Sequence, residues 1–144
     1  MELSIDTSTR QASIGLSQNG DIIAKNSWKS EQNHSKECFP KIIDLLEKTN
    51  LKSSDIHAVF VSKGPGGFSA LRVGISIAKS FAIGSKIPIV GVPSLDIEAY
   101  EFINDSKTVW AVINAGFNKI YVKKYTNNFE NACELISTEK FYTY

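Results

Sequence analysis

Two segments of the chain carry residue types and spacings that could do chemistry. Asp6-Thr7-Ser8-Thr9 follows the apolar residues 3–5, and a turn of this kind can bind an anion through its backbone N–H groups and hydroxyls. On their own the four residues favour a structural Asx or Ser/Thr turn between two strands. The second segment, Lys63–Gly74, reads KGPGGFSALRVG, and its glycines let the backbone approach a ligand or another chain closely.

The glycine-rich segment does not match the common phosphate-binding signatures. No Gly-Lys-Ser/Thr follows at the spacing of a P-loop, and Ser69 stands at the third glycine position of the dinucleotide fingerprint. A less specific role, facing a nucleotide or another anion, stays open for both segments. The residues that would do so are Asp6, Thr7, Ser8, Gly64, Gly66, Gly67, Ser69 and Arg72.

The helix predicted after this loop, to about Ile83, has small residues at every fourth position. Ala70, Gly74, Ala78 and Ala82 form a ridge that lets another element pack unusually close. Gly74 costs a helix about 1 kcal/mol relative to alanine, which indicates a packing reason. Because this helix is apolar nearly all round, it is either buried in its own domain or meets a partner, and the two readings stay open.

Composition excludes several classes of function. The 144 residues include 16 Lys+Arg and 15 Asp+Glu, a net charge of +1, and only Arg10 and Arg72 are arginines. Binding nucleic acid through bulk positive charge is therefore not expected, and any role in RNA chemistry would have to come through a partner. The acidic start and the lack of a long apolar run predict a reduced cytoplasmic protein without a membrane segment.

The histidines and cysteines do not form a metal-ligand pattern. His34, His57, Cys38 and Cys133 are far apart in sequence, no HxxxH or CxxC occurs, and no activated nucleophile is found, so we predict no metal site and no peptidase activity. We interpret His34 as a hydrogen-bonding residue at a helix entry and Cys38 as a buried thiol.

Periodicity predicts the elements that carry these segments. Residues 3–5, the alternating residues 12–16 and residues 21–28 predict an antiparallel meander, with Asn19-Gly20 as its hairpin turn. An apolar stripe from His34 predicts a helix that Pro40 delays or kinks and that Asn50 ends in the left-handed conformation.

Alternating strands and helices follow. Residues 58–61 predict a buried parallel strand, residues 88–92 a second short buried strand, and Ser94 the cap of a helix to about Phe102. The order βββαβαβα predicts an α/β lobe with a mixed sheet over residues 1–104.

The strand order then restarts. Residues 109–113, up to a polar break at Asn114, and residues 120–125 and 133–136 predict three more strands. Ile113-Asn114-Ala115 stands where Ile5-Asp6-Thr7 stood, so we interpret residues 105–144 as the shortened start of a second lobe, made of strands only.

Together these motifs resemble one family. IDTST near the start, His34-Ser35 at the first helix and GPGGFSALRVG before the second resemble TsaB (YeaZ), over about residues 1–125. The usual family loop reads GPGSFTGxRxG; Gly67, Ser69 and Ala70 depart from it. The matching positions are Gly64, Pro65, Gly66, Phe68, Arg72 and Gly74.

The resemblance implies an actin-like (ASKHA, ribonuclease H-like) fold and a non-catalytic role. The family is the partner of TsaD in making threonylcarbamoyladenosine beside the tRNA anticodon, and pairs through its first two helices. It also implies a homodimer through the same surface, a TsaE-like ATPase as a further partner, and ATP or ADP only at an interface shared with the partner, with no cofactor bound by this chain alone. The interface residues it implies here are His34, Cys38, Ile42, Phe68, Ala70, Leu71, Gly74, Ile75 and Ala78.

One departure bears on catalysis. Asn114-Ala115-Gly116 stands where the family usually has Asp-Ala-Arg, so the second turn is neutral. Because actin-like ATPases close two complete lobes on the nucleotide, hydrolysis by this chain alone is not expected. The alternative is a degenerate actin-like or sugar-kinase-like phosphotransferase that uses Asp6 and the 64–69 loop.

Overall fold

The computed structural model describes residues 1–31, 33–103, 108–126 and 134–137. The chain opens with the predicted antiparallel meander, made of β1 (Glu2–Asp6), β2 (Gln11–Gln18) and β3 (Asp21–Lys29). Asn19 and Gly20 both have positive φ at the β2–β3 turn, the conformation that an Asn-Gly hairpin requires.

Helix α1 (His34–Lys48) begins at His34 and contains Pro40, so the predicted late start is wrong. Asn50 has φ 55° and ends the helix as predicted. A short 3-10 helix, η1 (Ser53–Asp55), leads into β4 (Ala58–Ser62). Then come α2 (Phe68–Ser85), β5 (Ile89–Val92) and α3 (Ser94–Tyr100).

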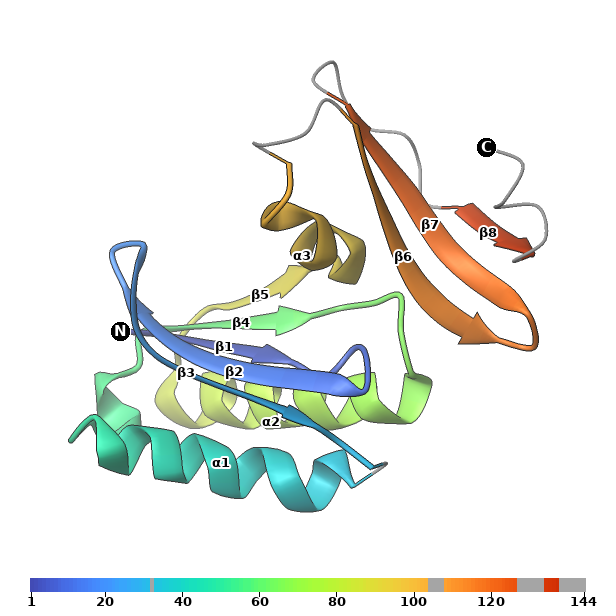
Figure 1. The fold of residues 1–144 in the computed structure, drawn as a ribbon. Helices are drawn as coiled ribbons and strands as arrows, with labels where there is room; N and C mark the ends of the chain where they lie inside the picture. The colour runs from blue at the N-terminus through green and yellow to red at the C-terminus, as the bar shows by residue number, and fades with distance from the viewer. Residues whose placement is uncertain (32, 104–107, 127–133, 138–144) are drawn as a thin grey trace.

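The first sheet has the strand order β3-β2-β1-β4-β5, and β4 pairs in parallel with both β1 and β5. Helices α1 and α2 lie side by side on one face of this sheet, and α3 lies on the other side (Figure 1). The core forms between the sheet and the two helices. Its fully buried members include Leu3, Ile5, Ile14, Leu16, Cys38, Ile42, Ile56, Val59 and Ala78.

Two expectations in this lobe are wrong. The strand predicted over residues 88–92 is not buried, because β5 is an edge strand and exposes Ile89 and Val90. Ser94 does not cap α3, because Pro93 holds the N-cap position and Ser94 is the first helical residue. A run of apolar residues indicates a strand but not its place in the sheet.

The second sheet has the order β6-β7-β8, with β6 (Thr108–Gly116), β7 (Lys119–Thr126) and β8 (Glu134–Ser137). Cys133 lies outside the described residues. The predicted break at Asn114 is wrong, since β6 continues to Gly116 and the turn is made by Phe117 and Asn118, with φ 51° and 56°. Gly116 and Asn118 tolerate positive φ and favour a turn here, whereas Phe117 does not.

Helix α3 packs against the second sheet. Leu95 and Ala99 share a buried cluster with Ala111, Ile113 and Tyr125. Asp96 accepts hydrogen bonds from Lys123 Nζ at 2.9 Å and from the Tyr125 hydroxyl. Pro93 follows directly on β5 and precedes the first turn of α3. Because α3 starts at the first sheet and packs on the second, it joins the two sheets. None of the helices in the described ranges is long and apolar enough to span a membrane.

Candidate functional site

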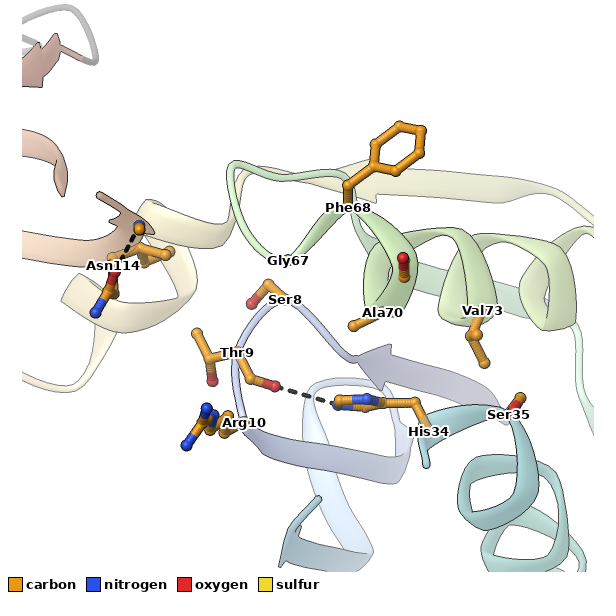
Figure 2. A pocket seen from close by; sticks show the side chains of 13 residues that line it. Ser8, Thr9, Arg10, His34, Ser35, Gly67, Phe68, Ala70, Val73 and Asn114 are labelled. Carbon is orange, nitrogen blue, oxygen red and sulfur yellow. Dashed lines mark hydrogen bonds between the residues drawn. The ribbon is translucent and has the colours of Figure 1, made fainter. Parts of the chain in front are cut away.

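A concave surface lies where four elements meet. The turn after β1, the N-terminal ends of α1 and α2, and the end of β6 surround a pocket of about 1110 Å³ (Figure 2). Its lining residues are Ser8, Thr9, Arg10, His34, Ser35, Gly67, Phe68, Ser69, Ala70, Val73, Ile113, Asn114 and Gly116.

Hydrogen bonds fix the turn after β1. The Asp6 Oδ1 atom accepts the Ser8 N–H at 2.9 Å, which is the structural Asx turn that the four residues favoured. The Thr7 hydroxyl donates to the carbonyl oxygen of Ala70 at 2.7 Å, and the Gly67 N–H donates to the Ser8 carbonyl oxygen at 2.9 Å. The turn is therefore attached directly to the start of α2.

This attachment explains the small-residue ridge of α2. A Cβ atom on Gly74 would overlap the Thr7 hydroxyl, and one on Gly66 would overlap the Ser8 carbonyl oxygen. Gly74, Ala78 and Ala82 are the buried residues of the helix. The ridge packs against the protein's own sheet and turn, so the glycine at position 74 serves an internal contact.

Four predicted interface residues are therefore corrected. Cys38 and Ile42 belong to the core under α1, and Gly74 and Ala78 face the sheet under α2, so none of the four can reach a partner in this structure. Burial also raises the pKa of the Cys38 thiol to about 11. Of the remaining interface residues, Phe68 is exposed, Ala70, Leu71 and Ile75 are half-buried, and His34 is nearly buried.

His34 joins α1 to the turn. Its Nε2 atom lies 3.3 Å from the carbonyl oxygen of Thr9 (Figure 2), a contact in which Nε2 must carry the proton because a carbonyl can only accept. The interpretation of His34 as a hydrogen-bonding residue at the helix entry fits this contact. The residue is 8% exposed and forms part of the pocket wall.

The pocket brings together only part of the predicted anion-facing set. Ser8, Gly67 and Ser69 line it, whereas Asp6, Thr7, Gly64, Gly66 and Arg72 are not among the lining residues. Sequence reasoning did not place Thr9, the last residue of the recognised turn, or Arg10, the residue after it, among the anion-facing residues, yet both line the pocket. Asn114 also lines the pocket, and its Oδ1 atom accepts the Gly116 N–H at 2.6 Å.

Among the described lining residues there is no aspartate or glutamate, and Arg10 is the permanently charged cation. In the part of the chain that the structure describes, no group of three or more His, Cys, Asp or Glu side chains could hold a metal ion. A carboxylate elsewhere responds to its neighbours: burial, and then the charge of Asp6, raise the pKa of Glu98. The electrostatics of the pocket suit an anion better than a cation.

Comparisons with known proteins identify the family. Residues 23–141 match the family model described as TsaD, tRNA N6-adenosine threonylcarbamoyltransferase. The chain belongs to this family. Within the TsaD family the predicted resemblance to TsaB (YeaZ) is confirmed. The TsaB protein of Buchnera aphidicola from Acyrthosiphon pisum, named for tRNA threonylcarbamoyladenosine biosynthesis, is 34% identical over 88% of this chain and 58% of its own length.

Solved structures agree on the fold. YeaZ from Pseudomonas aeruginosa superimposes with a TM-score of 0.85 at 23% identity, covering 96% of this chain and 68% of that one. An N-acetylglucosamine kinase, so far assigned only by similarity, from Porphyromonas gingivalis gives a TM-score of 0.55 at 15% identity over 93% of this chain and 47% of its own. The predicted actin-like α/β fold with a mixed sheet is confirmed. The chain spans little more than half the length of the curated TsaB relatives it matches.

Proposed function

We propose that this chain is a subunit of the machinery for threonylcarbamoyladenosine in tRNA, and that it docks a TsaD-like enzyme without doing chemistry itself. The name of the TsaB relative and the description of the family model support the first part. The second part draws on the pocket, in which the predicted carboxylate of Asp6 is absent from the lining and is hydrogen-bonded within its own turn.

The observation that carries the docking proposal is the apolar surface of α1 and α2. Although both helices bury one side against the sheet, Phe39 and Ile43 of α1 are exposed, and Phe68 and Ile83 of α2 are 74% and 77% exposed. We call these four residues the helical face. Large apolar side chains that stay exposed on helices are typical of protein–protein interfaces.

Phe68 is the strongest candidate anchor on the helical face. It stands at the start of α2, and the Arg72 guanidinium lies 5.5 Å from its ring centre, so one turn of helix presents an aromatic ring and a cation together. Aromatic and arginine side chains are enriched among residues that dominate binding energy. The partly buried Leu71 and Ile75 extend this surface along α2.

The remaining partner assignments come from the resemblance to TsaB and are part of the proposal. A homodimer through the helical face would compete with the TsaD-like partner, because both would cover Phe68. A TsaE-like ATPase would join only the assembled pair, ATP or ADP would bind only where the two subunits meet, and tRNA would contact the partner. The site of action would be the cytoplasm.

The test is the affinity of the purified chain for the TsaD-like protein of the same organism, measured by calorimetry. Phe68→Ala should weaken binding about tenfold or more, since loss of a central aromatic anchor costs about 2 kcal/mol. Tyr100→Ala is the matched control, because Tyr100 is 77% exposed at the end of α3, which lies on the other side of the first sheet from α1 and α2 (Figure 1). Equal affinity for wild type and Phe68→Ala, in a folded variant, would contradict docking through this face.

The phosphotransferase alternative has less support. It requires Asp6 to face the nucleotide, yet Asp6 accepts the Ser8 N–H, and the corresponding position of the second lobe is the neutral Asn114. Turnover of ATP by the purified chain, abolished by Asp6→Asn, would reverse this preference.

A further inference from the structure

We propose that Asn19 is a site of spontaneous chemical modification, at which the side-chain amide is converted to a carboxylate and ammonia is released. Asn19-Gly20 is the single Asn-Gly pair in the sequence, and it forms the turn between β2 and β3. The products are aspartate and isoaspartate, in which the main chain runs through the side-chain carbonyl carbon. The reaction takes water as its one co-reactant and is independent of the docking proposal.

The backbone nitrogen of Gly20 is the nucleophile. After losing its proton to hydroxide it attacks the side-chain carbonyl carbon of Asn19, Cγ. A new C–N bond forms, the Cγ–Nδ2 bond breaks, and the amide nitrogen takes a proton from water and leaves as ammonia. Water then opens the resulting five-membered cyclic imide, at Cγ to give aspartate or at the main-chain carbonyl carbon to give isoaspartate. The net reaction consumes one water and releases one ammonia.

The structure leaves both reacting groups available. Asn19 and Gly20 are exposed, and within the described residues neither the Gly20 N–H nor the Asn19 side-chain amide forms a hydrogen bond. A backbone N–H held in a strand ladder would first have to give up its partner, at a cost in free energy. Gly20 also brings no side chain near the attacking nitrogen, and nothing lies within 4 Å of the position that a Cβ would take.

The attack requires the turn to open briefly, and little packing holds this hairpin closed. β3 is an edge strand, and Ile22 and Ile23, its first apolar residues after the turn, are 70% and 48% exposed. The β2–β3 register also shifts between Leu16 and Ser17, close to the turn. Strand ends with few packed side chains open locally at little cost in free energy, so the amide can reach the geometry for attack.

The β6–β7 hairpin contains a matched asparagine. Asn118 has φ 56°, close to the 53° of Asn19, and it is also exposed. The next residue is Lys119, whose Cβ restricts the backbone in a way that glycine does not and crowds the attacking nitrogen. Because the two asparagines share a backbone conformation and differ in the residue that follows, modification should select Asn19.

Modification changes the charge of the whole chain. The formal net charge of +1 at pH 7 becomes 0 once one new carboxylate is present, and a protein without net charge associates more readily. The new carboxylate also stands next to Asp21. Isoaspartate lengthens the main chain by one atom, which disturbs the pairing of Gln18 with Asp21 that closes the hairpin.

The test is incubation of the whole purified chain at physiological temperature in mildly alkaline buffer, followed by isoelectric focusing and by peptide mass mapping. The net charge should fall from +1 to 0, with the mass change from NH2 to OH located at residue 19. An isoaspartate-specific methyltransferase with labelled S-adenosylmethionine should mark the same peptide. Asn19→Gln should keep its charge, because glutamine would have to close a six-membered ring, whereas Asn118→Gln should change like wild type.

A parallel incubation in guanidinium chloride, analysed by mass mapping, shows how fast the same Asn-Gly pair reacts without the fold. If the native protein stays unchanged over a period in which the unfolded chain loses its Asn19 amide, the hairpin protects the site and the proposal is wrong. Equal modification of Asn19 and Asn118 in the native protein, or a charge change that persists in Asn19→Gln, would overturn it as well.

Discussion

At the scale of single residues, the contact between Thr7 and Gly74 sets how the turn and α2 fit together. Gly74 has no side chain, which leaves room for the Thr7 hydroxyl to donate to the carbonyl oxygen of Ala70. This backbone carbonyl belongs to the helix, so the threonine joins the end of β1 to α2 by a hydrogen bond. The absence of a side chain at Gly74 is therefore what allows the turn, and with it the pocket wall, to pack against α2.

Substitution of this glycine should cost stability. Gly74→Ala places a Cβ against the Thr7 hydroxyl, so we expect the free energy of unfolding to fall by about 1–3 kcal/mol. Gly84→Ala is the control in the same helix, because nothing lies within 4 Å of its added Cβ; there a gain of about 0.5–1 kcal/mol is expected from helix propensity. Urea denaturation measures both. A gain in Gly74→Ala would show that the turn can move aside.

The buried thiol of Cys38 gives a prediction about pH. Its folded-state pKa is raised to about 11 from an ordinary value near 9, so the folded protein disfavours the thiolate. Keeping the Cys38 thiol protonated contributes to the free energy of unfolding fully below pH 9, and this contribution is lost as the pH rises toward 11. In a Cys133→Ser background, a thiol reagent at pH 8 should therefore label the native protein slowly and the urea-unfolded protein rapidly. Equal rates would show that Cys38 is accessible.

At the scale of elements, α3 depends on its polar contacts with the second sheet as well as its apolar ones. Burial alone raises the pKa of Asp96, but the hydrogen bonds from Lys123 and Tyr125, and the charge of Lys123, outweigh burial, so the pKa lies below its usual value. A carboxyl group whose pKa is lowered in the folded state stabilises the fold at pH values above its unfolded-state pKa. This stabilisation is lost as the pH falls through the folded-state pKa. Docking of α3 should weaken in acid.

Asp96→Asn tests this dependence. At pH 7 we expect the variant to lose about 1 kcal/mol or less, because the pair is only partly buried. Below about pH 4 the wild-type protein should lose the same increment, so that the stabilities of the two proteins converge. Asp44→Asn is the control, since Asp44 pairs with Lys48 on the exposed side of α1. Unfolding curves between pH 7 and pH 3 give the comparison, and parallel curves would contradict it.

Elements were predictable from sequence where local chemistry decides them. The Asn19-Gly20 hairpin and the left-handed Asn50 depend on backbone conformations that few residues adopt easily. The burial of β5 and the orientation of the α2 ridge depend instead on what packs above each face. Because a small-residue ridge looks the same whether it meets its own sheet or another protein, only the structure could assign Gly74 and Ala78 to the interior.

At the scale of the molecule, the described residues form separate apolar clusters. One lies between the first sheet and helices α1 and α2, and a second joins α3 to β6 and β7. Although α3 was expected to belong with residues 1–104, its buried residues Leu95 and Ala99 contact the second sheet. The boundary at residue 104 stays a prediction, but α3 should open together with β6 and β7.

Hydrogen exchange can separate the two clusters. Ala111→Asp places a charge in the second cluster, an unfavourable burial, so amides of α3, β6 and β7 should exchange faster while α2 and β4 keep their protection. Ile42→Ala, in the first cluster, should do the reverse. If Ala111→Asp accelerated exchange equally throughout the chain, the two clusters would be one cooperative unit.

The candidate site was predictable only in part. The turn and the glycine-rich loop were recognised because glycines and hydroxyls mark unusual backbone geometry, and the structure does join them. Thr9 and Arg10 belong to or adjoin the recognised turn, whereas Asn114 reaches the same pocket through the packing of a distant element, which spacing along the chain cannot indicate. Asp6 was the most suggestive residue by type, yet it serves its own turn.

The contact of Thr7 with Gly74 also constrains how related sequences can diverge. A side chain at position 74 becomes tolerable only once position 7 has lost its hydroxyl, as in alanine, whereas shrinking position 7 first leaves only a small gap. The two positions should therefore change in a fixed order along any lineage. Homologues with alanine at position 74 and threonine still at position 7 should be rare.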